Sequence, residues 1–356
     1  MSIFFKPAVF YPAGLSPYGI AAADFNGNGH LDLAITDIGN ESVAVLLGNG
    51  DGIFQPATFW DVGTNPTSVT AADFNNDGKM DLAVADSNGS DIAILIGNGD
   101  GTFQPATAFA AGSNPLTVVS ADFDGDGKMD LAVTDVGTDS VNVLLGNGDG
   151  TFQSAVPYSV GNSPYGIAAA DLNGNGIPDL VAANGGSNNV AVLLGNGDGT
   201  FQPAVYYPVG TGPMEIAVAD FNGDGKPDLA VTNFDSQNIA VLLGNGDGTY
   251  QPASFVPVGS NLEGIVAADF RSNGIIDLAV GDNGSDNIAV LAGKNNGTFW
   301  PPQFTAVGSY AAGLVAADFN EDGRADLAVT NSFSNNVAIL LNNTPPASRG
   351  VLFFIE

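Results

Sequence analysis

Cysteine is absent from this chain of 356 residues, and basic residues are scarce. Without cysteine, neither a disulfide nor a thiol nucleophile can form. The chain has 8 Lys and Arg against 38 Asp and Glu, a formal net charge of −30. A nucleic-acid-binding surface needs a basic face. We therefore expect no nucleic-acid partner.

Long apolar runs and helical periodicity are also missing. No apolar stretch approaches the ~20 residues of a membrane-spanning helix, and no segment shows the 3.6-residue period of an amphipathic helix. Residues 1–12 lack the basic start, apolar stretch and cleavage site of a signal peptide. We expect an all-β chain with no membrane span, and any export signal lies outside this sequence.

One pattern recurs seven times at a fixed interval of 49 residues, with no insertion or deletion between copies. Its copies begin at Asp24, Asp73, Asp122, Asp171, Asp220, Asp269 and Asp318. A unit of this size cannot bury its apolar face alone, so the period indicates stacked or ring-arranged units. We expect residues 1–344 to form a single domain, with residues 345–356 as an apolar tail suited to an extra edge strand.

The unit around Asp122 contains four short strand patterns, at residues 116–122, 131–134, 141–145 and 151–158. Asn-Gly and Asp-Gly between the last two predict a tight hairpin turn. Four such strands make one propeller blade, and seven blades close into a ring without long free edges. We therefore predict a seven-bladed β-propeller with four antiparallel strands per blade.

The two ends of the chain predict how the ring closes. Phe5 precedes its metal loop by the same 19 residues that separate Phe54 from Asp73. The chain thus begins with a fourth strand, while the last unit stops after its third strand at residues 337–341. We expect the N-terminal strand to complete the seventh blade.

The repeated loop reads D-x-[DN]-x-[DN]-G-x-x-D, which supplies oxygen ligands of the kind that Ca²⁺ prefers. Positions 1, 3, 5 and 9 offer side chains, and position 7 offers its carbonyl. An EF-hand closes with Glu at position 12, but that position here is Ile35, Val84 or Val133, inside the next strand. The alternative is that Asp, Asn and Gly serve only to build tight turns. Turns alone would not require the same oxygen-bearing positions in six loops.

Six loops carry the full pattern, and we expect about six calcium sites. Their candidate ligands are Asp24, Asn26, Asn28, His30 and Asp32; Asp73, Asn75, Asp77, Lys79 and Asp81; Asp122, Asp124, Asp126, Lys128 and Asp130; Asp171, Asn173, Asn175, Ile177 and Asp179; Asp220, Asn222, Asp224, Lys226 and Asp228; and Asp318, Asn320, Asp322, Arg324 and Asp326.

The loops should differ in strength, because ligand charge influences affinity. We expect the four-Asp loop at Asp122 to bind most tightly, and the loops at Asp24 and Asp171, with two Asn each, to be weaker. Arg271 stands at position 3 of the loop at Asp269, so we expect that site to be weak or empty. The Gly-Asn-Gly-Asp-Gly turns at Gly48, Gly146, Gly195 and Gly244 are interpreted as hairpins, and whether they add a metal oxygen stays open.

Two series of positions vary between repeats while their neighbours stay constant. The first starts the first strand, near the channel and opposite the metal loops, and reads Tyr18, Thr67, Leu116, Tyr165, Met214, Glu263 and Ala312. The second lies on the fourth strand and reads Tyr11, Trp60, Phe109, Tyr158, Tyr207, Val256 and Thr305. Drift and packing between blades are the simpler explanations, but aromatic rings also stack on sugars. We take Tyr18, Trp60 and Tyr165 as candidate ligand contacts.

No differentiated catalytic set is visible in the sequence. The single histidine, His30, lies inside the first loop, and the few glutamates form no recurring pair. Nearly every aspartate belongs to a metal loop or a turn. We therefore expect a protein that is not an enzyme, although carboxylates from separate blades could still meet.

The stretch Ala219 to Ala230, with the Leu-Leu-Gly-Asn-Gly-Asp-Gly-Thr-Tyr that follows it, resembles the FG-GAP/VCBS repeat of integrin α-subunit propellers and many extracellular bacterial proteins, and some fungal and bacterial lectins are similar. The resemblance covers residues 3–343. It implies a seven-bladed propeller with calcium between the first and second strands, and extracellular or cell-surface adhesion or glycan binding.

From this resemblance we expect a monomeric, multivalent, lectin-like protein that binds carbohydrate. The alternative is a propeller for protein adhesion or structural scaffolding. The copies are unusually alike, which fits recent amplification or a consensus sequence without a natural ligand.

Overall fold

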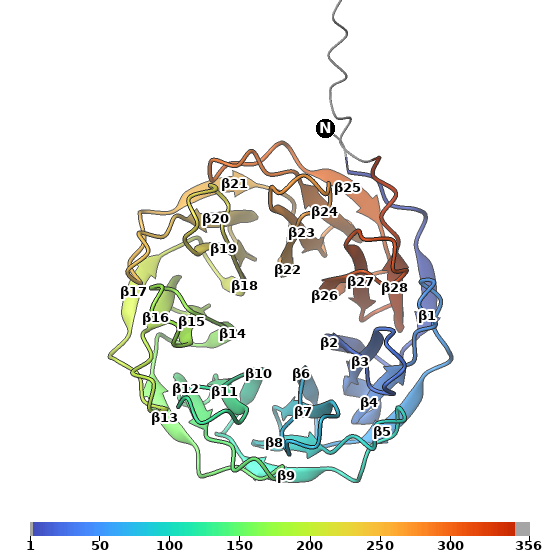
Figure 1. Cartoon of the computed structure of the whole chain (residues 1–356). Helices are drawn as coiled ribbons and strands as arrows, with labels where there is room; N and C mark the ends of the chain where they lie inside the picture. The colour runs from blue at the N-terminus through green and yellow to red at the C-terminus, as the bar shows by residue number, and fades with distance from the viewer. Residues whose placement is uncertain (1–2, 346–356) are drawn as a thin grey trace, which may run out of the picture.

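The chain forms a ring of seven four-stranded antiparallel sheets around a central channel (Figure 1). The structure is a computed structural model and describes residues 3–345. Its helical content, within that range, is one 3-10 turn, η1 (Ile38–Asn40). No helix in this part of the chain is long and apolar enough to cross a membrane. The predicted all-β propeller is confirmed.

The first four blades follow the chain in order, each running from the channel outward. They are blade 1, β2 (Pro17–Ala23), β3 (Asp32–Asp37), β4 (Ser42–Leu46) and β5 (Thr58–Asp61); blade 2, β6 (Pro66–Ala72), β7 (Asp81–Asp86), β8 (Asp91–Leu95) and β9 (Thr107–Ala110); blade 3, β10 (Pro115–Ala121), β11 (Asp130–Asp135), β12 (Ser140–Leu144) and β13 (Val156–Ser159); and blade 4, β14 (Pro164–Ala170), β15 (Asp179–Asn184), β16 (Asn189–Leu193) and β17 (Val205–Pro208).

The remaining three blades repeat this arrangement, and the last one includes the N-terminal strand. They are blade 5, β18 (Pro213–Ala219), β19 (Asp228–Asn233), β20 (Asn238–Leu242) and β21 (Ser254–Pro257); blade 6, β22 (Leu262–Ala268), β23 (Asp277–Asp282), β24 (Asn287–Leu291) and β25 (Gln303–Ala306); and blade 7, β26 (Ala311–Ala317), β27 (Asp326–Asn331), β28 (Asn336–Leu340) and β1 (Val9–Pro12).

The core lies between neighbouring blades. The second strand of every blade is buried along its whole length, as the run of apolar residues in β3 requires for a strand covered on both faces. One cluster joins Phe25 and Val45 of blade 1 to Leu82 and Phe103 of blade 2. The outermost strands are mostly exposed. Each blade is therefore stabilised chiefly by its two neighbours.

In six of the seven seams, the aromatic residue at position 2 of a metal loop pairs with an aromatic residue that precedes the fourth strand of a neighbouring blade. The ring of Phe25, at position 2 of the first metal loop, meets that of Phe103 in the next blade edge to face, with centroids 5.6 Å apart. Phe319 of the last blade meets Phe54 of the first in the same way. This repetition fixes the spacing between blades, because edge-to-face aromatic pairs have a specific geometry.

The N-terminal strand completes the seventh blade, as predicted. β1 pairs antiparallel with β28, with Tyr11 opposite Val337. Phe5 packs on Phe270 of blade 6 at 5.7 Å, which is the contact that its phase in the repeat predicts. The extra edge strand was expected within residues 345–356, and residues 346–356 lie outside the described residues.

The fourth strand is shorter than the sequence pattern suggested. The pattern in blade 3 runs over residues 151–158, but only Val156–Ser159 forms the strand β13, while Phe152 makes an isolated bridge to Gly146. In most units a proline stands between these two pairings. Proline has no N–H to donate to the ladder, which favours the break in those units. Blade 3 has Ser154 at this place and breaks in the same way, so the repeated geometry does not depend on proline alone.

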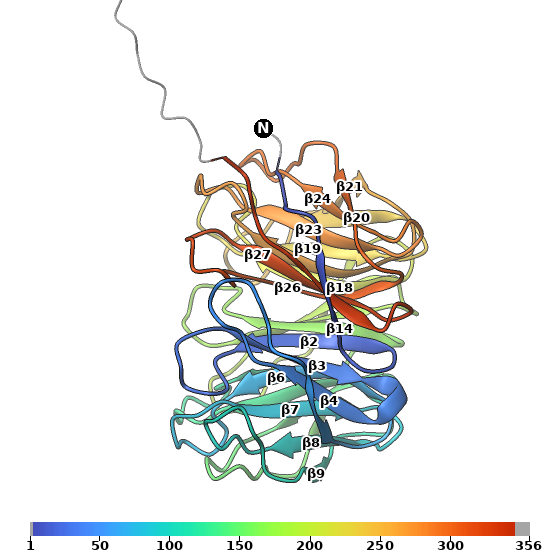
Figure 2. The same ribbon diagram turned by 90° about the vertical axis from the view of Figure 1, so that its right-hand side faces the viewer.

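A β-bulge interrupts the first strand of every blade. In blade 1 the register shifts between Pro17 and Ile20, which leaves Tyr18 and Gly19 out of the regular ladder beside the channel. Bulges redirect side chains and recur near functional sites. The loops gather on two opposite faces of the ring (Figure 2). The metal loops lie at the far end of the first strand, so the bulges are near the opposite face.

We predict that Phe5→Ala lowers the free energy of unfolding by about 2 kcal/mol, less than the ~3–5 kcal/mol of a fully buried phenylalanine because Phe5 is only partly buried. The control is Phe4→Ala, since the neighbouring Phe4 is 52% exposed. Thermal melts of both variants measure the difference.

Deletion of residues 1–12 should cause association between chains, because β28 becomes a free edge. Equal melting temperatures for the two point variants, or a monomeric deletion variant with an unchanged melt, would contradict closure by β1.

Candidate metal centres and channel cavity

The metal loops join the first and second strands of each blade. In blade 1 the loop begins at Asp24, directly after β2, and ends at Asp32, the first residue of β3. Phe25 at position 2 is 1% exposed and anchors the loop in the seam between blades. The strands and the aromatic anchor thus fix both ends of the loop, while positions 3 to 7 lie at the surface.

The closing aspartate is fully buried in all seven blades. In blade 1, Asp32 accepts hydrogen bonds from the backbone N–H of Phe25 at 2.9 Å and of Gly48 at 2.7 Å, one on each carboxylate oxygen. Asp130 repeats both bonds in blade 3. This carboxylate joins the loop, the second strand and the outer hairpin turn.

Burial makes the ionised form of the closing aspartate costly. It raises the pKa of Asp32, Asp81, Asp130 and Asp326 to about 6, although backbone hydrogen bonds and neighbouring charges also act on each carboxyl. The pKa values of Asp179 and Asp228 are raised for the same reason. A buried carboxylate without a cationic partner is unfavourable. These positions suit a bound cation.

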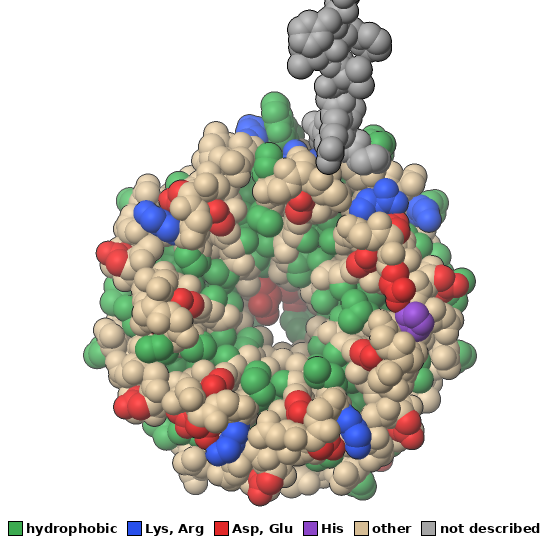
Figure 3. Space-filling view, viewed as in Figure 1, with side chains coloured by type: hydrophobic (Ala, Val, Ile, Leu, Met, Phe, Trp, Pro, Cys, Tyr) green, Lys and Arg blue, Asp and Glu red, His purple; other side chains and the backbone are tan. Residues whose placement is uncertain are grey.

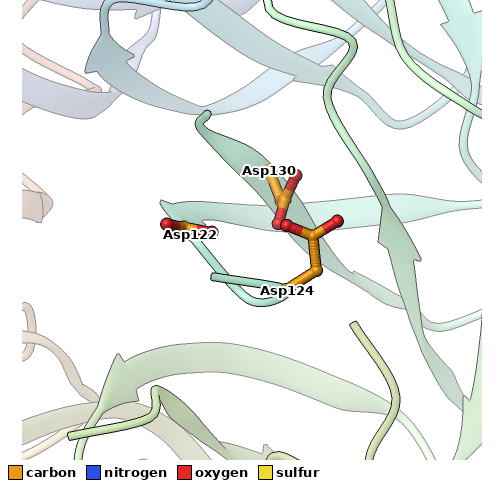
Figure 4. Close-up of side chains that lie close together, drawn as sticks. All are labelled: Asp122, Asp124 and Asp130. Carbon is orange, nitrogen blue, oxygen red and sulfur yellow. The ribbon is translucent and has the colours of Figure 1, made fainter. Parts of the chain in front are cut away.

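In the third loop, two further candidate ligands lie close to the closing aspartate. The carboxylate of Asp122 accepts hydrogen bonds from the N–H groups of Gly125 at 2.7 Å and Gly127 at 2.9 Å, which curl the loop. Carboxylate oxygens of Asp122, Asp124 and Asp130 all lie within 4.8 Å of one another (Figure 4). This acidic triad can hold a metal ion. The corresponding residue at position 3 is Asn in the other five intact loops, so their carboxylates are fewer.

Positions 5 and 7 vary together. Where position 5 is Asp, position 7 is Lys or Arg, and the two pair at the surface, as Lys128 Nζ does with Asp126 Oδ2 at 2.7 Å. Where position 5 is Asn, position 7 is His or Ile. Exposed pairs of this kind contribute little stability. Because each aspartate at position 5 comes with a basic residue at position 7, it adds little net charge to its loop. His30 instead contacts Glu321 of the neighbouring blade.

The sixth loop holds a cation of its own. The Arg271 side chain is 5% exposed, and its guanidinium contacts Asp277, with Nη2 2.6 Å from Oδ1. Nη2 also donates to the carbonyl of Gly293 at 2.7 Å. Burial raises the pKa of Asp277, and Arg271 opposes that rise. In the sixth loop, a guanidinium thus faces the closing carboxylate. Among the described residues, the closing carboxylates of the other loops have no such partner.

The hairpin turns use their aspartates locally. Asp149 Oδ1 accepts hydrogen bonds from the Thr151 N–H at 3.0 Å and from its hydroxyl at 2.6 Å. Gly150 donates to the carbonyl of Phe74 in the preceding blade. The interpretation of these turns as hairpins is confirmed, and their carboxylates stabilise the turn.

The structure brings Tyr18 and Tyr165 together but places Trp60 elsewhere. Both tyrosines line a cavity of about 540 Å³ at the channel mouth opposite the metal loops. Trp60 packs edge to face on Phe103 at 5.8 Å, at the outer part of a seam. Tyr11, Phe109, Tyr158 and Tyr207 make the equivalent contact in other seams. The fourth-strand series therefore packs between blades.

Sequence reasoning missed several residues of this cavity. Glu263 was noted only as one member of a variable series, while Phe234 and Tyr310 were not singled out. A second, narrower part of the channel, about 220 Å³, adds Glu215. Acidic side chains are visible within the central opening (Figure 3). The signal was available, because each of these residues departs from its counterparts in the other repeats.

Comparison with known proteins agrees with the repeat structure. The FG-GAP-like repeat family matches residues 24–84, 73–133, 131–182, 171–231, 220–280 and 269–329. No curated protein matches the chain.

Solved structures share the fold at low sequence identity. BBS1N, solved in complex with ARL6DN, is 15% identical with a TM-score of 0.69, covering 97% of this chain and 98% of that one. Virginiamycin B lyase from Staphylococcus aureus is 15% identical with a TM-score of 0.65, covering 95% and 99%. An Agrocybe aegerita lectin that recognises non-reducing terminal N-acetylglucosamine is 22% identical with a TM-score of 0.56, covering 81% and 80%.

These likenesses to a lectin, a lyase and a complex-forming propeller establish the architecture alone. The family matches extend over nearly the whole ring, and they contain the first position of all seven metal loops. The chain belongs to the FG-GAP-like repeat family.

Proposed function

We propose that this propeller is a calcium-dependent, non-catalytic binding module whose ligand is a carbohydrate. The observation that carries the calcium assignment is the contrast between the sixth loop and the others. Arg271 faces the buried closing Asp277 in the sixth loop, whereas the closing Asp130 of the third loop lies beside the carboxylates of Asp122 and Asp124 with no basic side chain among them. Clustered carboxylate and amide oxygens are the ligands that Ca²⁺ prefers.

The residues would act together as a clasp for each blade. Positions 1, 3, 5 and 9 supply side-chain oxygens, and position 7 supplies its carbonyl. Bound calcium would neutralise the closing carboxylate. The backbone bonds of Asp32 to Phe25 and Gly48 then hold the loop, strand and turn in one geometry. Calcium would therefore support the ring, while ligand binding takes place elsewhere.

The channel-mouth cavity is the proposed ligand site. Its volume of about 540 Å³ lies within the usual range for small-ligand sites. Tyr18 and Tyr165 offer aromatic rings, and Ser163 adds a hydroxyl. Such a combination of aromatic and polar groups suits a sugar. The similarity to a sugar-binding lectin supports this assignment. The proposal also includes export of the protein, because calcium and glycans are both available outside the cell.

A second candidate function is protein adhesion or scaffolding. The outer strands present aromatic side chains that are about half exposed, namely Phe10, Phe59, Tyr206, Phe255 and Phe304. A contiguous exposed apolar patch would mark a protein interface. These side chains instead repeat around the circumference, one on each of five blades. They favour the adhesion hypothesis less than the cavity favours a small ligand.

Calcium should raise the melting temperature strongly, because a ligand at 100 times its Kd adds about 2.7 kcal/mol per site that binds only the folded state. We expect six calcium ions in the wild type and seven in Arg271→Asn, which restores the ligand at position 3. Calorimetric titration counts the ions. The control Arg324→Asn removes a surface cation of the seventh loop and should leave the count at six. Equal melts with calcium and with chelator would remove the metal assignment.

The calcium-free protein should lose stability as pH rises. The closing carboxyls have folded-state pKa values of about 6 against an ordinary value of 3.8, so the folded state binds more protons between these values. The free energy of unfolding then falls with rising pH across this window. We expect a melting temperature about 5 °C or more higher at pH 5 than at pH 7.5. With saturating calcium the trend should reverse, because protons compete with the metal. A calcium-free protein that is more stable at pH 7.5 would contradict the unpaired buried carboxylates.

A glycan panel tests the carbohydrate assignment. Calcium-loaded wild type should bind at least one glycan, and Tyr18→Ala or Tyr165→Ala should weaken that binding about tenfold, since each ring contributes about 1 kcal/mol or more. Trp60→Ala is the matched aromatic control, because Trp60 packs in a seam away from the cavity. Absence of any bound glycan would favour the adhesion hypothesis. Binding that is lost only in the Trp60 variant would move the site to the seam.

A further inference from the structure

The repeats differ from one another most at one end of the channel. Eight residues before each metal loop, six repeats carry Ser, Asn or Gly, but the seventh carries Tyr310. Five residues before the loop, Glu215 replaces Gly, Ser or Thr. Six residues before it, Glu263 replaces uncharged residues. The equivalent positions of the other repeats show which residues a blade needs in order to fold. Tyr310, Glu215 and Glu263 are therefore not explained by the folding of the blade.

These departures converge in space. The cavity of about 540 Å³ is lined by Tyr18, Tyr165, Met214, Phe234, Glu263 and Tyr310, contributed by five different blades. It adjoins the narrower part of the channel that contains Glu215. Neither lining includes a lysine, an arginine or a histidine. The asymmetric residues of a symmetric ring thus form one aromatic and acidic cavity.

The cavity has two acidic residues, the exposed Asp235 and Glu263, and Glu263 is 3% exposed. The Tyr18 hydroxyl donates to its Oε1, and the Asn283 amide donates to its Oε2 at 2.6 Å. These donors are neutral. They stabilise a carboxylate but leave its charge without a counterion. The buried group has good hydrogen bonds and lacks only a positive charge nearby.

Glu215 adds a second carboxyl to the same channel. Burial, followed by the charge of Glu263, raises the pKa of Glu215 to about 8. Its side chain lies against Gly166 of the preceding blade, where a Cβ would meet Oε2 at 2.6 Å. Two acids that share an enclosed space repel each other unless one binds a proton or a cation is present. A bound cation would relieve both.

Tyr310 occupies a conformation that disfavours its side chain. Its φ is 63°, in the left-handed region that bulky residues rarely adopt, and Ser16, Ser163 and Gly212 also have positive φ at this position. Its ring lies 4.6 Å from that of Phe333, which is 71% exposed. A residue retained against backbone strain is a candidate for a functional role.

We propose that the channel-mouth cavity binds a small organic ammonium ion, held by the aromatic side chains and by the charge of Glu263. Aromatic faces and carboxylates both attract an alkylated ammonium group, and the apolar lining suits its methyl groups. The cavity offers two carboxylates, Glu263 and Asp235, but Glu263 is already hydrogen-bonded to Tyr18 and Asn283. A metal ion needs a shell of free oxygen ligands, whereas an ammonium ion can be held by charge and aromatic faces. The inference rests on the proposed function only in treating this cavity as a ligand site, and it does not require a sugar.

The test uses choline and its neutral isostere 3,3-dimethylbutan-1-ol, titrated calorimetrically into the calcium-saturated chain at 150 mM salt. We expect one choline per chain and binding of the isostere that is weaker by about tenfold or more. Glu263→Gln keeps the shape and should weaken choline by a similar factor. Glu41→Gln removes one exposed charge that lines neither part of the channel and should leave choline binding unchanged. Equal binding of the two probes, or equal weakening by both glutamine variants, overturns the proposal.

Tyr310→Ser separates binding from folding. Serine occupies the same left-handed position in two other repeats, so this variant should melt within a few degrees of the wild type and bind choline about tenfold more weakly. Unchanged choline binding in this folded variant contradicts the aromatic wall. Glycans bound without choline overturn this inference and leave the carbohydrate function standing. Choline binding without binding of any glycan supports this inference and overturns the carbohydrate function.

Discussion

The buried aspartate that opens the second strand of every blade is the constraint on which the ring depends. Its two oxygens hold the backbone of the preceding loop and of the outer hairpin turn, so one carboxylate connects three segments. The same loop carries the phenylalanine that packs against the next blade. Seam packing, hairpin position and metal-loop geometry therefore share a common anchor. Its burial also makes its charge costly without a cation, and in the sixth blade Arg271 supplies that cation.

The near-identity of the repeats makes the chain its own reference. Four loops pair an aspartate at position 5 with a basic residue at position 7, and three loops have neither, so the local charge changes little around the ring. Arg271 departs from the pattern and brings its charge to Asp277. Charge is therefore balanced locally at positions 5 and 7, whereas position 3 carries a basic residue only in the sixth loop.

A closed ring also creates a place where symmetry can be broken without cost to the blades. The first residue of each bulge, such as Tyr18 or Glu263, lies outside the regular ladder and lines the channel. The second residue lies against the next blade, where a Cβ at Gly19 or Gly264 would meet its backbone. Tyr18 and Glu263 use the freedom of the first position, while the equivalent position in blade 7 is Ala312. The scaffold is thus maintained by the repeated residues, and a differentiated cavity is formed by the residues that differ.

Much of this architecture follows from the sequence by itself. The 49-residue period, the alternation of short strands with Gly-rich turns and the phase of Phe5 predict the blades, the metal loops and the closing strand, because each depends on local pattern or on a repeated interval. The tertiary structure decided which variable aromatics meet: Trp60 packs in a seam, whereas Tyr18 and Tyr165 share a cavity. It also decided that Tyr18 contacts Glu263 and that Arg271 contacts Asp277. The Tyr18–Glu263 contact joins residues 245 positions apart, and only closure of the ring brings their blades within reach of each other.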